Sequence, residues 1–449
     1  MMSPLHVTPF VPGRARGPVH FGAANGGPEH RVVVLSYDEL LGFSGAAAAL
    51  VVVGTAPLAH PMLRLAGMQL PTVIIAPHQA RELREGDWVT VDASEGLIGD
   101  PELYERPERR QRPAVQPGAP VLTADRVAVE LRASVAGTAA AQAARRHAAA
   151  RVGIVRTEYL LASGPHPPGV DALTAAFREV CEAAAPLEVT FRLLDLAADK
   201  RPEWLPEMPD MQGLLGLRGS RLYEREPVRS VYLAQVEALA RVAEDHPVRM
   251  MLPYVVRTED FLARREEILA HGGGSVPLGL MAETPAACLA MDQWLELAQF
   301  VSIGCNDLMQ CLFGADRGVA ELAGVLDPYA PVLYRFLAQV GQVAGPGIDR
   351  IQLCGVLPRV PRVVPVLVGL GYRNLCAEPQ YLDSLSLSLG RTTQDTARAL
   401  ARAVCAIPDS AGVRTLLGLR ETDPWSLPEA MPGSRQGRPT GGDARGRRR

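Results

Sequence analysis

The sequence has almost no lysine and no overall excess of basic residues. Of the 46 lysine and arginine residues only Lys200 is a lysine, and 49 acidic residues bring the formal net charge to −3. The final stretch, 433–449, holds six arginines and one aspartate, so the rest of the chain carries −8, since −3 minus +5 is −8. A general nucleic-acid binder presents a basic face, so this composition argues against that class. The tail arginines stand among Gly, Pro, Ser and Thr, which predicts a disordered Arg-rich segment over 426–449.

Long apolar runs and closely paired cysteines are missing too. The longest apolar stretch, 43–58, is interrupted by Ser44, Gly45, Gly54 and Pro57, so we expect no membrane-spanning helix. The chain starts with several prolines, which is not typical of a signal peptide. Its seven cysteines include no Cys-x-x-Cys pair. This pattern argues against a zinc knuckle and indicates free thiols in a reducing cytoplasm.

Proline marks one domain boundary. Residues 99–125 contain five prolines and no amphipathic period, so we expect a Pro-rich linker over 101–125. Before it, residues 1–100 show short β-branched runs and room for one helix near Pro61, which predicts a small α/β domain. The strands predicted in this domain are Arg31–Leu35, Leu50–Val53, Thr72–Ile75 and Trp88–Val91.

Beyond the linker, β-branched runs alternate with alanine- and leucine-rich helical stretches. Eight such strands in about 300 residues predict a (β/α)8 TIM barrel over 126–425, whose chemistry lies at the carboxyl ends of the strands. The predicted strands are Val127–Val135, Val152–Val155, Val189–Leu193, Val248–Leu252, Leu278–Met281, Phe300–Ile303, Ile351–Leu353 and Asn374–Ala377. The predicted helices are Thr138–Ala150, Val170–Ala184, Pro227–Asp245, Thr258–His271, Pro285–Leu297, Leu326–Gly345 and the amphipathic stretch Thr393–Cys405.

Polar residues follow several of these strands. Glu283 and Asp307 come after neighbouring strands, and two carboxylates suit a Mg²⁺ ion that keeps several of its waters. The planar guanidinium suits phosphate and carboxylate, so an anion with both groups would use the nearby arginines. Taken singly, each residue is more simply explained as a loop ion pair, or as a small buried side chain for a cysteine. The coincidence at strand ends favours one site, and its candidates are Arg156, Arg192, Arg218, Glu283, Asn306, Asp307, Arg317 and Cys354.

The same residues lie in motifs that resemble those of phosphoenolpyruvate (PEP)-utilising enzymes, most closely the phosphotransferase Enzyme I of the bacterial sugar phosphotransferase system. The resemblance runs from about 127 to 385. Its motifs are VRTEYL (155–160), FRLLDLAADK (191–200), LLGLRGSRL (214–222), LGLMAETPAA (278–287), VSIGCNDLMQ (301–310), GADRG (314–318) and LCG (353–355).

The resemblance implies a role for each candidate. Glu283 and Asp307 match the Mg²⁺ ligands, and Asn306 matches an asparagine that contacts the substrate. Cys354 matches the acid that protonates the enolate as pyruvate forms, so we expect a shielded, protonated thiol. The arginines around the phosphoryl and carboxylate groups match Arg156, Arg192, Arg218 and Arg317, and Lys200 closes an Asp-Lys motif after the third barrel strand.

The first domain resembles the swivelling phosphohistidine domain of the same family. His60 stands where the family has its phosphorylated histidine, although Thr55–Ala59 lacks the hydroxyl groups that usually flank it. The resemblance implies phosphoryl transfer from PEP to His60, onward transfer to a separate carrier protein, and a homodimer through the barrel.

Two other functions stay open. Val356 replaces a glutamate of the family motif, and a chain of 449 residues has no room for the helical insert that binds the carrier protein. Both features, with the altered histidine motif, favour a non-catalytic PEP-binding regulatory paralogue. The chain also has no ATP-grasp domain, so a subunit of a split PEP synthase or pyruvate phosphate dikinase is the other alternative.

Overall fold

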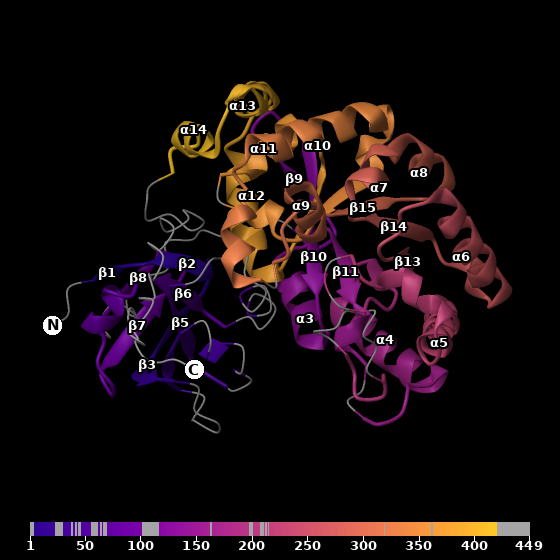
Figure 1. Ribbon diagram of the computed structural model, residues 1–449, viewed down its shortest axis with the longest axis horizontal. Coiled ribbons are helices and arrows are strands. Elements are labelled where there is room, and N and C mark those ends of the chain that lie inside the picture. The colour runs from indigo at the N-terminus through magenta and orange to yellow at the C-terminus, as the bar shows by residue number, and fades with distance from the viewer. Residues whose placement is uncertain are drawn as a thin grey trace, which may run out of the picture.

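The computed structural model describes two structural units in the chain (Figure 1). It describes residues 4–419 except 23–29, 37–38, 41–42, 44–45, 55–61, 63–64, 66–69, 101–115, 162–163, 197–200, 207–210, 212, 214, 318 and 361. The predicted phosphoacceptor His60, Lys200 and the Arg-rich tail therefore lie outside the described residues, as does most of the helix expected after Pro61.

The first unit is built on an eight-stranded mixed sheet with the order β1-β8-β7-β3-β4-β5-β6-β2. Its central strands β3 to β6 pair in parallel. Their valines and leucines are buried on both faces of the sheet, as the uninterrupted apolar runs predict. The strands are β1 (Leu5–His6), β2 (Thr8–Val11), β3 (Arg14–Phe21), β4 (Val32–Ser36), β5 (Ala49–Val53), β6 (Thr72–Ile75), β7 (Trp88–Asp92) and β8 (Leu97–Gly99).

The second unit is a closed barrel of eight parallel strands, which confirms the predicted fold. Strand β10 pairs in parallel with both β11 and β17 and so closes the sheet, and a short antiparallel strand β9 (Val121–Leu122) extends it. The barrel strands are β10 (Ala128–Val135), β11 (Arg151–Arg156), β12 (Val189–Arg192), β13 (Val248–Leu252), β14 (Leu278–Ala282), β15 (Val301–Gly304), β16 (Ile351–Cys354) and β17 (Asn374–Ala377).

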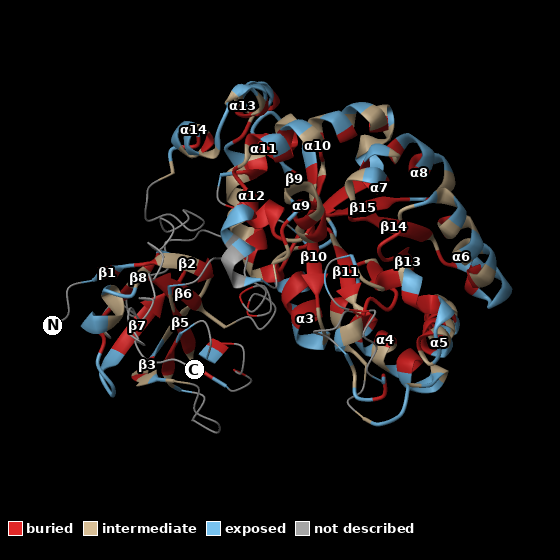
Figure 2. Ribbon diagram, in the orientation of Figure 1, coloured by how far each residue is buried: buried red, intermediate tan, exposed pale blue. Residues whose placement is uncertain are grey.

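Helices surround the barrel, and Figure 2 shows the strands between them as buried. None of the helices in the described ranges is long and apolar enough to cross a membrane. The helices are α3 (Thr138–Arg146), α4 (Val170–Ala184), α5 (Val228–Val242), α6 (Thr258–Ala270), α7 (Pro285–Leu289), α8 (Met291–Leu297), α9 (Cys305–Phe313), α10 (Pro331–Ala344), α11 (Val364–Gly369), α12 (Leu382–Gly390), α13 (Gln394–Ala406) and α14 (Ser410–Leu416).

Several helix boundaries differ from the prediction for local reasons. The single helix expected over 285–297 is two helices, because the chain leaves helical geometry at Ala290, with φ −92° and ψ 24°. Helix α3 ends at Arg146, since Ala148 takes a left-handed φ of 52°. Helix α10 starts at Pro331 rather than Leu326, and proline favours the first turn. Strand β3 was not predicted, because its Arg, Gly and Pro residues leave no run of β-branched or apolar residues that would indicate a strand.

The two units touch at strand β2. The Tyr381 hydroxyl donates a hydrogen bond of 2.5 Å to the backbone oxygen of Phe10, and Phe10 and Val11 belong to the same continuous apolar core as the barrel. Tyr381 directly precedes α12, the barrel helix that lies beside the first unit in Figure 1. The contact brings the first unit close to the carboxyl end of β17.

The interior of the barrel is tightly packed around Gly153. A Cβ atom on Gly153 would lie 2.5 Å from Gln352 Oε1 and 2.9 Å from Cys376 Sγ, and the Gln352 amide donates to both the Gly153 carbonyl and the Ser302 hydroxyl. We therefore expect Gly153→Ala to lower the free energy of unfolding by about 1–3 kcal/mol through overpacking. Denaturant unfolding measures the loss.

Gly390→Ala is the matched control, because a Cβ atom there would meet nothing within 4 Å. It should not destabilise the protein and should raise the free energy of unfolding by at most about 1 kcal/mol, because alanine restricts the unfolded chain. Equal stability of the two variants would contradict the packing described for the interior.

Candidate active site at the carboxyl ends of the barrel strands

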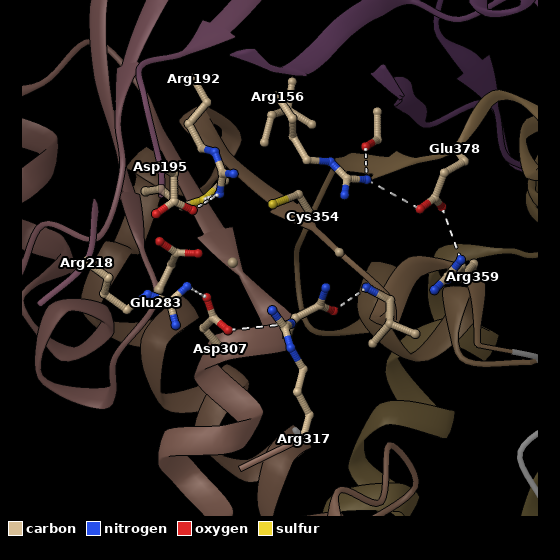
Figure 3. Close-up of a pocket in the computed structure, with 17 residues that line it drawn as sticks. Arg156, Arg192, Asp195, Arg218, Glu283, Asp307, Arg317, Cys354, Arg359 and Glu378 are labelled. Atoms are coloured by element: carbon tan, nitrogen blue, oxygen red, sulfur yellow. Dashed lines mark hydrogen bonds and ion pairs between the residues drawn. The ribbon is translucent and has the colours of Figure 1, made fainter. Parts of the chain in front are cut away.

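Two arginines end neighbouring strands at the mouth of the barrel. Arg156 is the last residue of β11 and Arg192 the last of β12, and the two are direct partners in the strand register. Because successive parallel strands point the same way, their carboxyl ends meet at one face. The sequence-based expectation that these side chains share a mouth is met, as Figure 3 shows.

Two carboxylates pair with the Arg192 guanidinium. Its Nη2 lies 2.6 Å from Glu158 Oε1 and its Nη1 lies 2.7 Å from Asp195 Oδ2. Burial disfavours the charged guanidinium, but the attraction of Asp195 and Glu158 outweighs burial and raises the pKa of Arg192. The Arg192 side chain therefore stays charged, and its two ion pairs hold it in place at the edge of the pocket.

Asp307 gathers the next pair of arginines. Its Oδ2 accepts from Arg218 Nη2 at 2.7 Å, and its Oδ1 lies 3.5 Å from Arg317 Nη1 and accepts from Gln310 at 2.7 Å. Arg218 also stacks on the ring of Tyr254, 4.8 Å from its centroid. Asp307, in the first turn of α9, therefore holds two predicted anion-binding arginines at the mouth.

Glu283 directly follows β14 and is buried beside these charges. Its Oε2 accepts from the backbone N–H of Tyr254 at 3.0 Å. A Cβ atom on Gly304 would lie 2.6 Å from Glu283 Oε1, so glycine at the end of β15 gives the carboxylate its place. Burial, with repulsion from Asp307 and Asp195, raises the pKa of Glu283 well above its usual range.

The carboxylates that gather around Glu283 suit a hard cation. Glu283 and Asp307 are both 4% exposed, and buried Asp195 Oδ1 has no hydrogen-bond partner among the described residues. A Mg²⁺ ion prefers carboxylate oxygens, needs few protein ligands and relieves the repulsion between them. No group of three or more His, Cys, Asp or Glu side chains arranged for a metal occurs in the described parts of the chain. The residues present therefore fit a two-carboxylate site completed by water and substrate.

Cys354 ends β16, in register with Gly304 on β15. It is 4% exposed, and burial raises its pKa to about 11 despite a hydrogen bond with Ser302 and the nearby Arg192 and Arg156. The thiol is consequently protonated at neutral pH, as the role predicted for it requires. The role itself remains a prediction.

Asn306 is fixed by the turn that follows Cys354. Its Oδ1 accepts from the backbone N–H of Val356 at 2.8 Å. Gly355 adopts a φ of +94° there, and a Cβ atom on it would lie 2.7 Å from Asn306 Oδ1. Close approach and positive φ both require glycine at this turn.

The pocket also contains residues that the sequence analysis did not assign to the site. Glu378 immediately follows β17, so the search for polar residues at strand ends could have found it. Ser134 within β10 and Arg359 in the short 3-10 helix after β16 carry no such signal. The unassigned lining residues are Ser134, Ile154, Asp195, Met281, Gly304, Gly355, Val356, Arg359 and Glu378. Of the predicted site residues, His60 and Lys200 lie outside the described part of the chain, so their place relative to the pocket stays a prediction.

Comparison with known proteins places this pocket in a family. Residues 110–390 match the model of the PEP-utilising enzyme, PEP-binding domain. The chain is 31% identical over 369 residues to the phosphoenolpyruvate-protein phosphotransferase of Streptomyces coelicolor, covering 80% of this chain and 66% of that protein. The phosphotransferase of Haloferax volcanii is 29% identical over 379 residues, again 80% of this chain and 66% of the relative.

A longer relative also matches. The multiphosphoryl transfer protein of Rhodobacter capsulatus is 28% identical over 375 residues, which is 80% of this chain and 45% of that protein. The chain thus spans less than two thirds of the length of each of these relatives.

The protonation state of Cys354 gives a prediction. With a pKa of about 11, only about one thiol in 1,000 is ionised at pH 8, and the thiolate is the reacting form. Since the pKa is raised above the ordinary value of about 8.5, alkylation of Cys354 by iodoacetamide should rise about tenfold per pH unit from pH 7 to pH 10. Peptide mass spectrometry follows each cysteine separately. The urea-unfolded protein is the control, and a Cys354 rate that levels off near pH 8 would contradict the protonated thiol.

Proposed function

The chain belongs to the family of PEP-utilising enzymes through their PEP-binding domain, and we propose that it transfers the phosphoryl group of PEP to an enzyme histidine and releases pyruvate. The acceptor histidine we propose is His60. The observation that carries the proposal is the convergence of four arginines, two buried carboxylates and a buried thiol on one barrel mouth.

The charges of the pocket complement PEP. The substrate carries a phosphate and a carboxylate, and a planar guanidinium can bind either with two parallel hydrogen bonds. Arg156, Arg192, Arg218 and Arg317 would divide the two anionic groups between them, and Asn306 would add a hydrogen bond. Fixed positive charge in a buried site stabilises the negative charge that spreads over the phosphoryl oxygens in the transition state.

The reaction needs two bond changes at phosphorus and one proton. The bond from phosphorus to the enol oxygen breaks as a bond from phosphorus to a His60 ring nitrogen forms. The electron pair left on the enol oxygen makes the enolate of pyruvate, and its C3 carbon takes the proton of the Cys354 thiol. Solvent then returns a proton to the sulfur. The raised pKa of Cys354 supports this step, because a thiolate would have no proton to give.

Glu283 and Asp307 are the residues that would hold Mg²⁺. When bound, the ion would neutralise phosphoryl charge and complete its coordination with water and substrate oxygens. A separate contact holds each carboxylate in place: Arg218 lies against Asp307, and the Tyr254 backbone N–H donates to Glu283.

The acceptor beyond His60, the contribution of Lys200 and the assembly extend the same proposal. We propose a separate carrier protein as the next phosphoacceptor, a contact of the Lys200 ammonium with the substrate, and a homodimer through the barrel. The match to a multiphosphoryl transfer protein supports the idea of a relay of phosphoryl groups.

A labelling experiment tests the transfer. Wild-type protein incubated with Mg²⁺ and PEP labelled in its phosphoryl group should gain acid-labile, base-stable label, and His60→Ala should gain none. Cys354→Ala should bind PEP as wild type does but form pyruvate at least about 100-fold more slowly, which is the usual contribution of a general acid. Cys405→Ala, far from the pocket on α13, is the matched control. Label that persists in His60→Ala would exclude His60, and tight PEP binding without any label in wild type would favour the regulatory alternative.

The metal site has its own test. Glu283→Gln keeps the size of the side chain and removes its charge, so PEP binding should lose its dependence on Mg²⁺ and weaken by at least about tenfold, as expected when one charged partner of a buried pair is lost. Calorimetry with Mg²⁺ and with EDTA measures both effects. Glu296→Gln, exposed on α8, is the control. Binding by Glu283→Gln that still responds to Mg²⁺ like wild type would refute the proposed ligand.

A further inference from the structure

Arg359 and Glu378 form a second charged layer at the rim of the pocket. Glu378 lies between two arginines, with Oε1 at 3.7 Å from Arg156 Nη2 and Oε2 at 3.4 Å from Arg359 Nη1 (Figure 3). Both Glu378 and Arg359 line the pocket, and they are 8% and 7% exposed. A single buried carboxylate is therefore shared between one arginine proposed to bind substrate and one outside that set.

Arg359 is held from the other side by aromatic rings. Its guanidinium lies 5.4 Å from the ring centroid of Tyr381 and 5.7 Å from that of Phe10. Phe10 belongs to strand β2 of the first unit, and its backbone oxygen accepts the hydrogen bond from Tyr381. A cation over a ring face is attracted by the ring, more strongly when both are removed from water. Arg359 thus joins the first unit to the rim of the pocket.

The charge balance of this layer decides how Arg156 can act. Glu378 is buried and needs a cation, because an unpaired buried carboxylate is strongly disfavoured. With Arg359 in place, one Glu378 oxygen faces Arg359 and the other stays 3.7 Å from Arg156 Nη2. The same Nη2 donates to the Ser134 hydroxyl at 3.2 Å, and the other N–H groups of Arg156 are left to turn to a ligand. Without Arg359, Arg156 would be the remaining arginine of the pair, and a tight two-bond contact with Glu378 would compete with any anion for the same guanidinium.

We propose that Arg359 is a positioning residue for substrate binding, which holds Glu378 away from Arg156 and is itself held by Phe10 of the first unit. The inference rests on the proposed function only in naming PEP as the anion that Arg156 binds. The contact between the two units then directly affects the affinity of the pocket for its anionic ligand.

A double-mutant cycle tests the proposal. Arg359→Met should weaken PEP binding, measured by calorimetry with Mg²⁺, by about tenfold, which is within the range of coupling between directly interacting residues. Glu378→Gln alone should change the affinity by less than about threefold, since Arg156 is already available. The double variant should return to within about threefold of wild type, because the competing carboxylate is gone.

Other roles for Arg359 predict other results. If Arg359 only adds positive charge, Glu378→Gln should tighten binding by the same factor with and without Arg359, and additive effects would overturn the proposal. If Arg359 only supports the fold, the double variant should not recover. Thermal unfolding of every variant checks the fold, and Arg359→Gln replaces Arg359→Met in the cycle if the methionine variant is unstable. Arg145→Met, exposed on α3, is the matched control and should bind as wild type does.

The part played by the first unit is tested at Phe10. Phe10→Leu keeps an apolar side chain and removes the ring face, so it should weaken PEP binding by about threefold, because the cation–π contact with Arg359 is lost. Glu378→Gln should abolish that effect too, and an effect of Phe10→Leu that persists in the Glu378→Gln background would contradict the link. The same cycles run with inorganic phosphate separate the two proposals. Wild-type protein that binds phosphate but not PEP would refute the proposed function, while the phosphate cycles would still decide the role of Arg359.

Discussion

The arrangement of charges at the mouth of the barrel depends on the buried guanidinium of Arg192, which lies at the end of β12 and is only 6% exposed. A charge removed from water is tolerated only beside a partner, and Arg192 has Glu158 and Asp195 within 2.7 Å. Arg218 and Asp307 form a similar buried pair at the same mouth. Glu283 lies among these carboxylates and arginines. A bound cation would compensate the carboxylates, and a bound polyanion would compensate the arginines, so the site is suited to both.

Much of this arrangement could be predicted from the sequence, because parallel barrel strands are buried on both faces. Uninterrupted runs such as those around Val189 and Val248 therefore mark strands without any alternation of polar residues, and the predicted bounds of the eight barrel strands agree with the observed ones to within one residue. The first polar residue after such a run must lie at the mouth. That rule found Arg156 and Glu283, and it would have found Glu378 if it had been applied to the last strand.

The sequence could not reveal which charges pair with which. Asp307 lies against Arg218, 89 residues away along the chain, and the contact exists only because the barrel closes. Arg359 follows no strand directly, and its partners come from β2, the end of β17 and the short 3-10 helix before α12. Strand β3 escaped prediction for a related reason, since pairing with β4 and β7 stabilises a segment whose own residues do not favour a strand.

The pairing also separates the arginines of the pocket into two kinds. Arg192 and Arg218 are held by carboxylates at 2.6–2.7 Å, so they keep their places whether or not a ligand is bound. Arg156 and Arg317 lie 3.5–3.7 Å from theirs, and contacts this long leave much of the hydrogen-bonding capacity of the guanidinium unused. An anionic ligand gains most binding energy from the loosely held arginines, because it has weaker existing contacts to displace there. The loosely held arginines are therefore the ones whose orientation should depend on their neighbours, and for Arg156 that neighbour is Glu378, whose other oxygen is held by Arg359 at the contact with the first unit.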